Sequence, residues 1–219
     1  MRGLGYESYE GSLRGSRGTL WSEAGNGFDQ ASLLIALLRA SGIPAAYRLG
    51  ALDQTDAQTL LNSMFPAVNA PSGLVSAGTA TADPANDSTL IAEVQNHAWA
   101  EAYFPGGGWT TLDPAFASAQ PGDQFGSASG GQLVELPDAT RHKVTVSLEV
   151  EKYSQFPVGG SNLYRVNPLT ASFSTVALAG EPLVFAHLVD SAYQGGMAFT
   201  TAEHTYTPLL RLWRSTNAH

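Results

Sequence analysis

The sequence predicts an α+β domain followed by an all-β module. Three observations support this fold class: a leucine-rich stretch with helical spacing at residues 29–41, two aromatic-rich runs around a glycine turn at residues 93–112, and alternating apolar and polar residues from residue 143 onward. A helical stripe beside a hairpin pattern indicates a helix packed on an antiparallel sheet. We expect the first domain to span residues 1–132 and a sandwich-like β module to span residues 133–219, with the chain cut from a longer protein.

The composition argues against nucleic-acid and membrane partners and against catalysis by a thiol. The 219 residues carry a net charge of −8, from 19 acidic and 11 basic side chains, and neither sign forms a run. A nucleic-acid partner is therefore not expected. No apolar stretch approaches the ~20 residues of a membrane helix, so we expect no membrane insertion. The chain contains no cysteine, which excludes a sulfur nucleophile.

Metal and cofactor sites are not expected either. Four of the five histidines fall in the C-terminal part of the chain, at His142, His187, His204 and His219. None of them has the i, i+4 spacing that holds zinc on a helix. The glycine-rich run at residues 105–108 joins two predicted strands rather than a strand and a helix, so it predicts a turn and not a phosphate-binding loop.

The helix at residues 29–41 has signals at both ends. Its apolar stripe consists of Ala31, Leu34, Ile35 and Leu38. Asn26 and Asp29 are candidate N-caps, because their side chains can accept the free backbone N–H groups of a first helical turn. Gly42 followed by Pro44 predicts the end of the helix, since glycine adopts the left-handed conformation and proline cannot continue.

The other elements are predicted in chain order. Residues 1–24 predict an irregular surface segment, residues 45–49 a short strand, and residues 58–64 a second, weaker helix. The Ala/Ser/Gly-rich residues 69–86 predict a surface excursion or lid, and residues 118–131 predict a linker or surface loop. In the β module, strands are expected at residues 143–150, 170–178, 183–188 and 206–213.

The hairpin at residues 93–112 brings two titratable residues together. If Tyr103 lies opposite Trp109, then His97 and Asp113 share one face of the sheet, with about 7–8 Å between their backbones. At that separation the carboxylate can reach the imidazole. A histidine base oriented by a carboxylate is the supporting pair of thiol acyl-transfer sites, whose nucleophile lies at a helix N-terminus.

Three runs of sequence, in this order, resemble the transglutaminase-like superfamily. They are the helix segment from Gly25 to Ala45, the run from His97 to Tyr103, and the run Gly108-Trp109-Thr110-Thr111-Leu112-Asp113-Pro114. The resemblance covers roughly residues 10–120. It implies a transglutaminase or papain-like core, with an N-terminal helix packed on an antiparallel sheet. The first segments are most similar to bacterial members found in large exported proteins.

The resemblance also implies site residues. The family's catalytic histidine and aspartate fall on His97 and Asp113, and its cysteine falls on Gly27, which has no side chain to attack with. The arginine of the family's Gly-Ile-Pro-Ala-Arg run is Ala46 here, with Arg48 nearby as a candidate substitute. Residues that could line a substrate groove are Trp99, Trp109 and Asn26, although core packing is an alternative for the two tryptophans.

The sequence leaves several functions open. The first hypothesis is a non-catalytic member that binds a peptide or protein, or serves as a structural module, in a larger exported or envelope-associated bacterial protein. The alternative is an amide-acting enzyme, seen as a nucleophile-less variant or acting through a water molecule activated by His97. Asp29 could serve as nucleophile, but a cap is its commoner role. A carbohydrate-binding β module is a third hypothesis, and the oligomeric state stays open.

Overall fold

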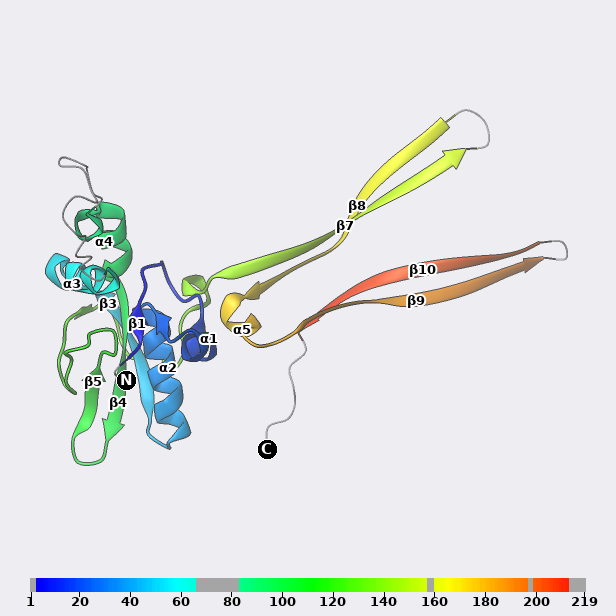
Figure 1. The fold of residues 1–219 in the computed structure, drawn as a ribbon. Helices are drawn as coiled ribbons and strands as arrows, with labels where there is room; N and C mark the ends of the chain where they lie inside the picture. The colour runs from blue at the N-terminus through cyan, green and yellow to red at the C-terminus, as the bar shows by residue number, and fades with distance from the viewer. Residues whose placement is uncertain (1–2, 66–82, 157–159, 197–198, 213–219) are drawn as a thin grey trace, which may run out of the picture. The chain divides into compact units, whose positions relative to one another are not determined.

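The computed structural model describes residues 3–65, 83–156, 160–196 and 199–212 (Figure 1). The chain divides into two compact units, one ending at His142 and one beginning at Lys143. Helices and antiparallel sheets are both present, which confirms the α+β class. The predicted excursion at residues 69–86 lies outside the described residues up to residue 82. None of the helices in the described ranges is both long and apolar enough to cross a membrane.

A four-stranded sheet and one helix form the centre of the first unit. The strand order is β5 (Gly108–Leu112), β4 (Asn96–Phe104), β3 (Ala45–Ala51) and β6 (Ser127–Ala128), and all neighbours are antiparallel. Helix α2 (Gly27–Ala40) packs on one face of this sheet (Figure 1), where Ile35 joins buried alanines of β3 and β4. The predicted helix on an antiparallel sheet is confirmed.

Both ends of α2 follow the sequence signals. The Asn26 side chain accepts a hydrogen bond from the Asp29 N–H at 3.0 Å, so Asn26 is the N-cap. At the other end, Gly42 has φ +77° and the Ile43 N–H donates to the Leu38 carbonyl at 2.9 Å. This arrangement ends a helix with its last carbonyls satisfied.

The hairpin has the predicted register but a shorter first strand. Tyr103 lies opposite Trp109, as the sequence analysis assumed. Residues 93–95, predicted as strand, instead end helix α4 (Ser88–Gln95). The Asp87 carboxylate caps this helix by accepting the N–H groups of Thr89 and Leu90. Val94 joins the buried cluster around Leu60, which favours the helical conformation.

The N-terminal segment is not irregular throughout, which corrects the sequence prediction. Residues Gly15–Ser22 form helix α1, and β1 (Gly5–Tyr6) pairs in parallel with β2 (Ala24–Gly25). The residue before α1 makes no side-chain cap. The carboxylate of Asp29, on α2, accepts backbone N–H groups at the start of α1 instead. A contact between distant segments thus stabilises a helix that local sequence does not signal.

A second set of elements covers one end of the sheet. Helix α3 (Gln54–Met64) begins earlier than the predicted residues 58–64, because the Asp53 side chain accepts the Asp56 N–H at 2.8 Å. A short 3-10 turn, η1 (Pro84–Asn86), precedes α4. The core between these helices and β1 contains Tyr6, Leu60, Leu61 and Phe116.

Residues 117–142 return across the first unit rather than leaving it. Within the predicted loop at residues 118–131, β6 pairs with β3 and Gly126 is buried. Further on, Leu136 packs against Phe28 and Ala98. The Ser12 N–H donates to the carbonyl of Thr140, the last residue of the short turn η2 (Asp138–Thr140). The first compact unit therefore includes residues 133–142, which the sequence analysis assigned to the β module.

The second unit consists of two antiparallel hairpins. One pairs β7 (Lys143–Phe156) with β8 (Gly160–Ser174), and the other pairs β9 (Leu183–Gly196) with β10 (Phe199–Leu212). The predicted strand at residues 170–178 ends early, because α5 (Thr175–Leu178) is helical. Val144 lies opposite Phe173 and Val146 opposite Ala171, which gives β7–β8 one apolar face. The sandwich-like packing of this unit stays a prediction.

Candidate functional site

His97 and Asp113 meet at one end of the four-stranded sheet. His97 is near the start of β4, and Asp113 directly follows β5. The Nε2 atom of His97 and the Oδ2 atom of Asp113 lie 2.9 Å apart, and the exposed fractions of the two side chains are 1% and 2%. The other carboxylate oxygen accepts the Ala115 N–H at 3.2 Å. Both oxygens of Asp113 are therefore engaged, and the imidazole is held in one orientation.

Gly27 lies against the opposite edge of the same imidazole ring. It is the first residue of α2, where the resemblance places the nucleophile. A Cβ atom added to Gly27 would lie 2.3 Å from both Nδ1 and Cε1 of His97, and 3.1 Å from the Ala98 carbonyl oxygen. The optimal separation of two carbon atoms is about 3.5–4.0 Å. The His97 ring thus fills the space that a side chain at position 27 would need.

Two aromatic rings lie beside the buried histidine. Trp99 stacks near the His97 ring with centroids 6.2 Å apart, and Phe116 approaches it edge-on at 6.0 Å. Added Cβ atoms at Gly50 and Gly126 would each lie 2.8 Å from the Trp99 ring. These two glycines therefore allow the backbone to close over Trp99, which is itself buried. Sequence reasoning missed both, since neither has a local signal.

The surroundings of the His97–Asp113 couple are acidic. Burial raises the pKa of the Tyr6 phenol, and the negative charges of Asp113 and Glu93 raise it further. The pKa of Asp56, in the first turn of α3, is raised by burial, then by Asp53 and Asp113, while His97 lowers it. These shifts place two more oxygen-bearing side chains within electrostatic reach of the couple.

Asn26, a predicted substrate-binding residue, is buried and fully engaged with backbone. In addition to capping α2, its amide group donates to the carbonyls of Tyr9 and Gly11 at 2.8 and 2.6 Å. These bonds tie the N-terminal segment to the start of α2. The structure thus places Asn26 beside Gly27 as a structural link, with no free polar atom directed to a ligand.

Asp29 lies one turn further into α2 and is also inside the protein. Its carboxylate accepts five hydrogen bonds, from the hydroxyls of Tyr9 and Ser12 and from the N–H groups of Leu13, Arg14 and Gly15. The pKa of Tyr9 is raised by burial and by the charge of Asp29. From the sequence, Asp29 is a candidate nucleophile or a cap of its own helix. The structure shows it anchoring the N-terminal segment and α1.

Trp109 lies away from the buried couple. Tyr103, its partner across the hairpin, is six residues from His97 along β4, which is about 20 Å at 3.4 Å per residue. Trp109 is 46% exposed, and its ring meets the Tyr103 ring edge-on at 5.7 Å. Arg48 forms an ion pair with Glu101 at 3.0 Å. The structure therefore brings together His97, Asp113, Gly27 and Trp99, but not Trp109 or Arg48.

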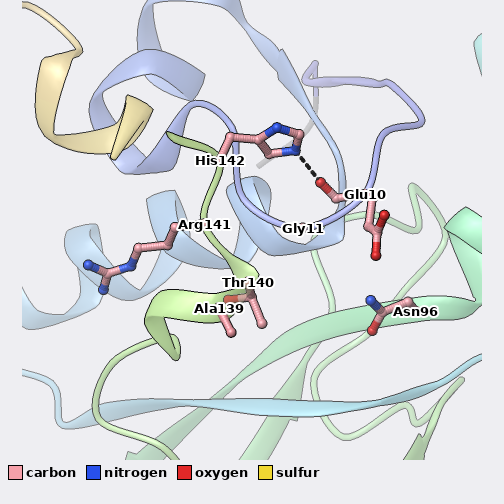
Figure 2. Close-up of a pocket in the computed structure, with 7 residues that line it drawn as sticks. All are labelled: Glu10, Gly11, Asn96, Ala139, Thr140, Arg141 and His142. Atoms are coloured by element: carbon pink, nitrogen blue, oxygen red, sulfur yellow. Dashed lines mark hydrogen bonds between the residues drawn. The ribbon is translucent and has the colours of Figure 1, made fainter. Parts of the chain in front are cut away.

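Two hollows border this end of the sheet. One, of about 500 Å³, reaches Asp113 from the side of Leu4 and residues 114–120. The other, of about 290 Å³, includes Glu10, Asn96 and His142 (Figure 2). Figure 2 shows the His142 ring directed at the Glu10 carbonyl, with which it forms a hydrogen bond, and the Arg141 side chain extending away from Asn96. Within the described residues, no group of three metal-ligating side chains is placed to hold an ion.

Comparison with known proteins agrees with the order of motifs along the chain. The family model described as the transglutaminase-like superfamily matches residues 4–114. This range contains Gly27, His97 and Asp113, and it ends directly after the aspartate. Comparisons with curated proteins and with solved structures gave no match.

Proposed function

Because the chain belongs to the transglutaminase-like superfamily, we propose that it is a non-catalytic member in which the His97–Asp113 couple is part of the core. The observation that carries the proposal is the position of the His97 ring, whose Nδ1 edge lies in the space of a side chain at position 27. In an acyl-transfer site that edge would face the nucleophile, as the base. Here it packs against a backbone.

The burial of the couple also argues against a water-based reaction. A water molecule activated by His97 would need to approach a free ring nitrogen. Nε2 is bonded to Asp113, and Nδ1 lies against Gly27 in a side chain that is 1% exposed. The rings of Trp99 and Phe116 lie beside the imidazole, with centroids 6.2 and 6.0 Å from its own. Both nitrogen atoms are thus enclosed by the protein itself.

The remaining role for such a domain is to bind a peptide or protein, or to connect other parts of a larger chain. We place it in an exported or envelope-associated bacterial protein, because the N-terminal segment and the α2 run resemble such members. The adjoining unit supports a connecting role, since its two long hairpins expose apolar side chains that include Leu163, Phe185 and Leu188. Exposed apolar strands are typical of surfaces that contact other protein.

A turnover assay tests the proposal. The full chain is incubated with a fluorescent primary amine and a glutamine-bearing acceptor protein, and separately with a chromogenic amide. We expect no incorporation and no hydrolysis above the protein-free blank. His97→Ala serves as the control variant. Turnover by the wild-type chain that His97→Ala abolishes would contradict the proposal.

Restoring the thiol gives a second arm of the same test. In Gly27→Cys the new Cβ must displace the His97 ring, so the thiol is not paired with an oriented base. We expect slow alkylation by iodoacetamide, similar to that of a buried unactivated thiol, and no amine incorporation. Fast alkylation together with turnover would show that a working site is retained around position 27.

A further inference from the structure

A second concave surface lies at the end of the sheet opposite to His97, between β3, β5, the last turn of α2 and the returning segment. It is a groove of about 380 Å³. Ala46 of β3 lies at its floor, Trp109 of β5 forms one wall, and Leu133 and Val134 of the returning segment form the other. Ala45 also borders the groove, but its side chain packs in the cluster with Ile35 on the α2 face. Its volume is at the lower end of the range for ligand pockets, about 300–1,000 Å³.

Position 46, at the floor of the groove, carries a small side chain. Ala46 on β3 is paired with Glu101 on the neighbouring strand β4. Both side chains are on the face that carries Trp109. The resemblance places an arginine at this position. A side chain of that length would extend over the floor toward Glu101. Ala46 itself is buried, and the accessible apolar surface of the groove comes from Trp109 and Val134, which are 46% and 74% exposed.

A fixed positive charge stands at one end of the groove. The Arg39 guanidinium donates through Nε and Nη2 to the Ala45 carbonyl at 3.1 and 2.8 Å, and through Nη2 to the Val134 carbonyl at 2.7 Å. These bonds hold the side chain in place and leave the N–H groups of Nη1 for another acceptor. In the described part of the chain, no carboxylate forms an ion pair with Arg39.

We propose that this groove binds the C-terminal residue of another polypeptide that ends in an apolar side chain. An apolar wall beside an unpaired guanidinium matches a ligand with an apolar group and a carboxylate close together. A C-terminal residue carries both on one Cα atom, and it is small enough for this volume. Charge complementarity between Arg39 and the terminal carboxylate selects this occupant over a neutral peptide or a glycan.

Binding of a polypeptide at this groove rests on the proposed function, in which the domain binds a peptide or protein. Recognition then lies in the Trp109 groove rather than in the sealed position beside His97. This placement also gives Trp109 the ligand contact that the sequence analysis expected, at a place distant from the other predicted site residues.

Fluorescence anisotropy with the full chain tests the inference. The probe is fluorescein-labelled Gly-Ser-Gly-Val-Leu with a free C-terminus, and the comparison peptides are its C-terminal amide and a form ending in Gly. We expect saturable binding of the free acid. Amidation removes the charged acceptor for Arg39, and a C-terminal Gly removes the apolar group that packs on Trp109, so each change should weaken binding by about tenfold.

Three variants separate the parts of the groove. Arg39→Gln removes the charge, Trp109→Ala removes one wall, and Ala46→Arg fills the floor; each should weaken binding of the free acid by about tenfold or more. The matched controls are Arg17→Gln and Trp21→Ala, because both residues are exposed on α1, away from the groove. They should leave the affinity within about twofold. Thermal unfolding of each variant checks that it folds.

The outcomes are distinguishable from those of the turnover assay. Absence of binding at millimolar probe, equal affinity for acid and amide, or unchanged affinity in Trp109→Ala would each overturn the inference. If Arg39→Gln fails to fold, Ala46→Arg and the amidated peptide still test whether the groove binds a terminal carboxylate. Turnover with intact groove binding would refute only the non-catalytic assignment, and no binding without turnover would refute only the groove.

Discussion

Replacing Asp29 by alanine is expected to lower the free energy of unfolding of the first unit by about 4 kcal/mol. A hydrogen bond to a charged group contributes about 1.5–3 kcal/mol, and the Asp29 carboxylate accepts five such bonds in the interior. The contributions do not add, because neighbouring donors share one acceptor. Alanine would leave the N–H groups of Arg14 and Gly15 without their acceptor. Urea unfolding followed by tryptophan fluorescence measures the loss.

A carboxylate with a simpler role provides the matched control. Asp53 is exposed and caps α3 by accepting one backbone N–H, from Asp56. Asp53→Ala should therefore cost about 1 kcal/mol, the usual value for an N-cap. The loss of stability in Asp29→Asn should fall between those of the two alanine variants. The amide keeps the shape of the carboxylate, but its NH2 group would face other donors. If Asp29→Ala costs no more than Asp53→Ala, the anchoring role assigned to Asp29 is wrong.

The second large effect is expected at Asp113. Asp113→Ala should lower the free energy of unfolding by about 3 kcal/mol, because an unpaired buried polar group costs about 1–3 kcal/mol and the Ala115 N–H loses its acceptor as well. Asp113→Asn keeps an oxygen and the shape, so we expect it to cost about 1 kcal/mol. The same urea unfolding experiment measures both.

The control for this prediction is Asp123, an exposed carboxylate that accepts one N–H group in the described part of the chain, that of Gln120. Asp123→Ala should change the stability by less than about 1 kcal/mol. A loss at Asp113 that is as small as the loss at Asp123 would mean that the couple does not contribute to the core. In that case the burial of His97 would need another explanation.

The elements that the sequence predicts best are those whose signals are local. Helix α2 has a continuous apolar stripe, an N-cap at Asn26 and a left-handed residue at Gly42, and the structure contains all three. The hairpin register follows from two aromatic residues flanking a glycine turn, with Tyr103 opposite Trp109. In both cases neighbours along the chain determine the conformation, so that the pattern is sufficient.

The elements that the sequence analysis missed depend on distant contacts. Helix α1 starts where Asp29 accepts its backbone N–H groups, and its own glycine and serine residues are typical of loops. Residues 93–95 look like the start of a strand because polar and apolar residues alternate there. They are helical because Val94 packs into the cluster with Leu60 and Leu61.

The candidate site divides in the same way. The hairpin register places Asp113 within reach of His97, and sequence reasoning was sufficient for that pair. Two other close contacts connect distant elements. The His97 ring of β4 lies against Gly27 at the start of α2, and Trp99 of β4 lies against Gly126 of the returning segment. Such close contacts depend on the packing of elements that are far apart in the chain, which no local pattern encodes.

The stability of Gly27→Ala tests most directly whether the His97 ring occupies the space at position 27. Without that contact, alanine in place of glycine in a helix would stabilise the fold by up to about 1 kcal/mol. With a Cβ atom 2.3 Å from a ring held by Asp113, we expect the free energy of unfolding to fall by about 2 kcal/mol. Gly131→Ala, at a position with no atom within 4 Å of an added Cβ, is the control. A fall in Gly27→Ala alone agrees with a sealed, non-catalytic core, whereas a gain in stability would contradict it.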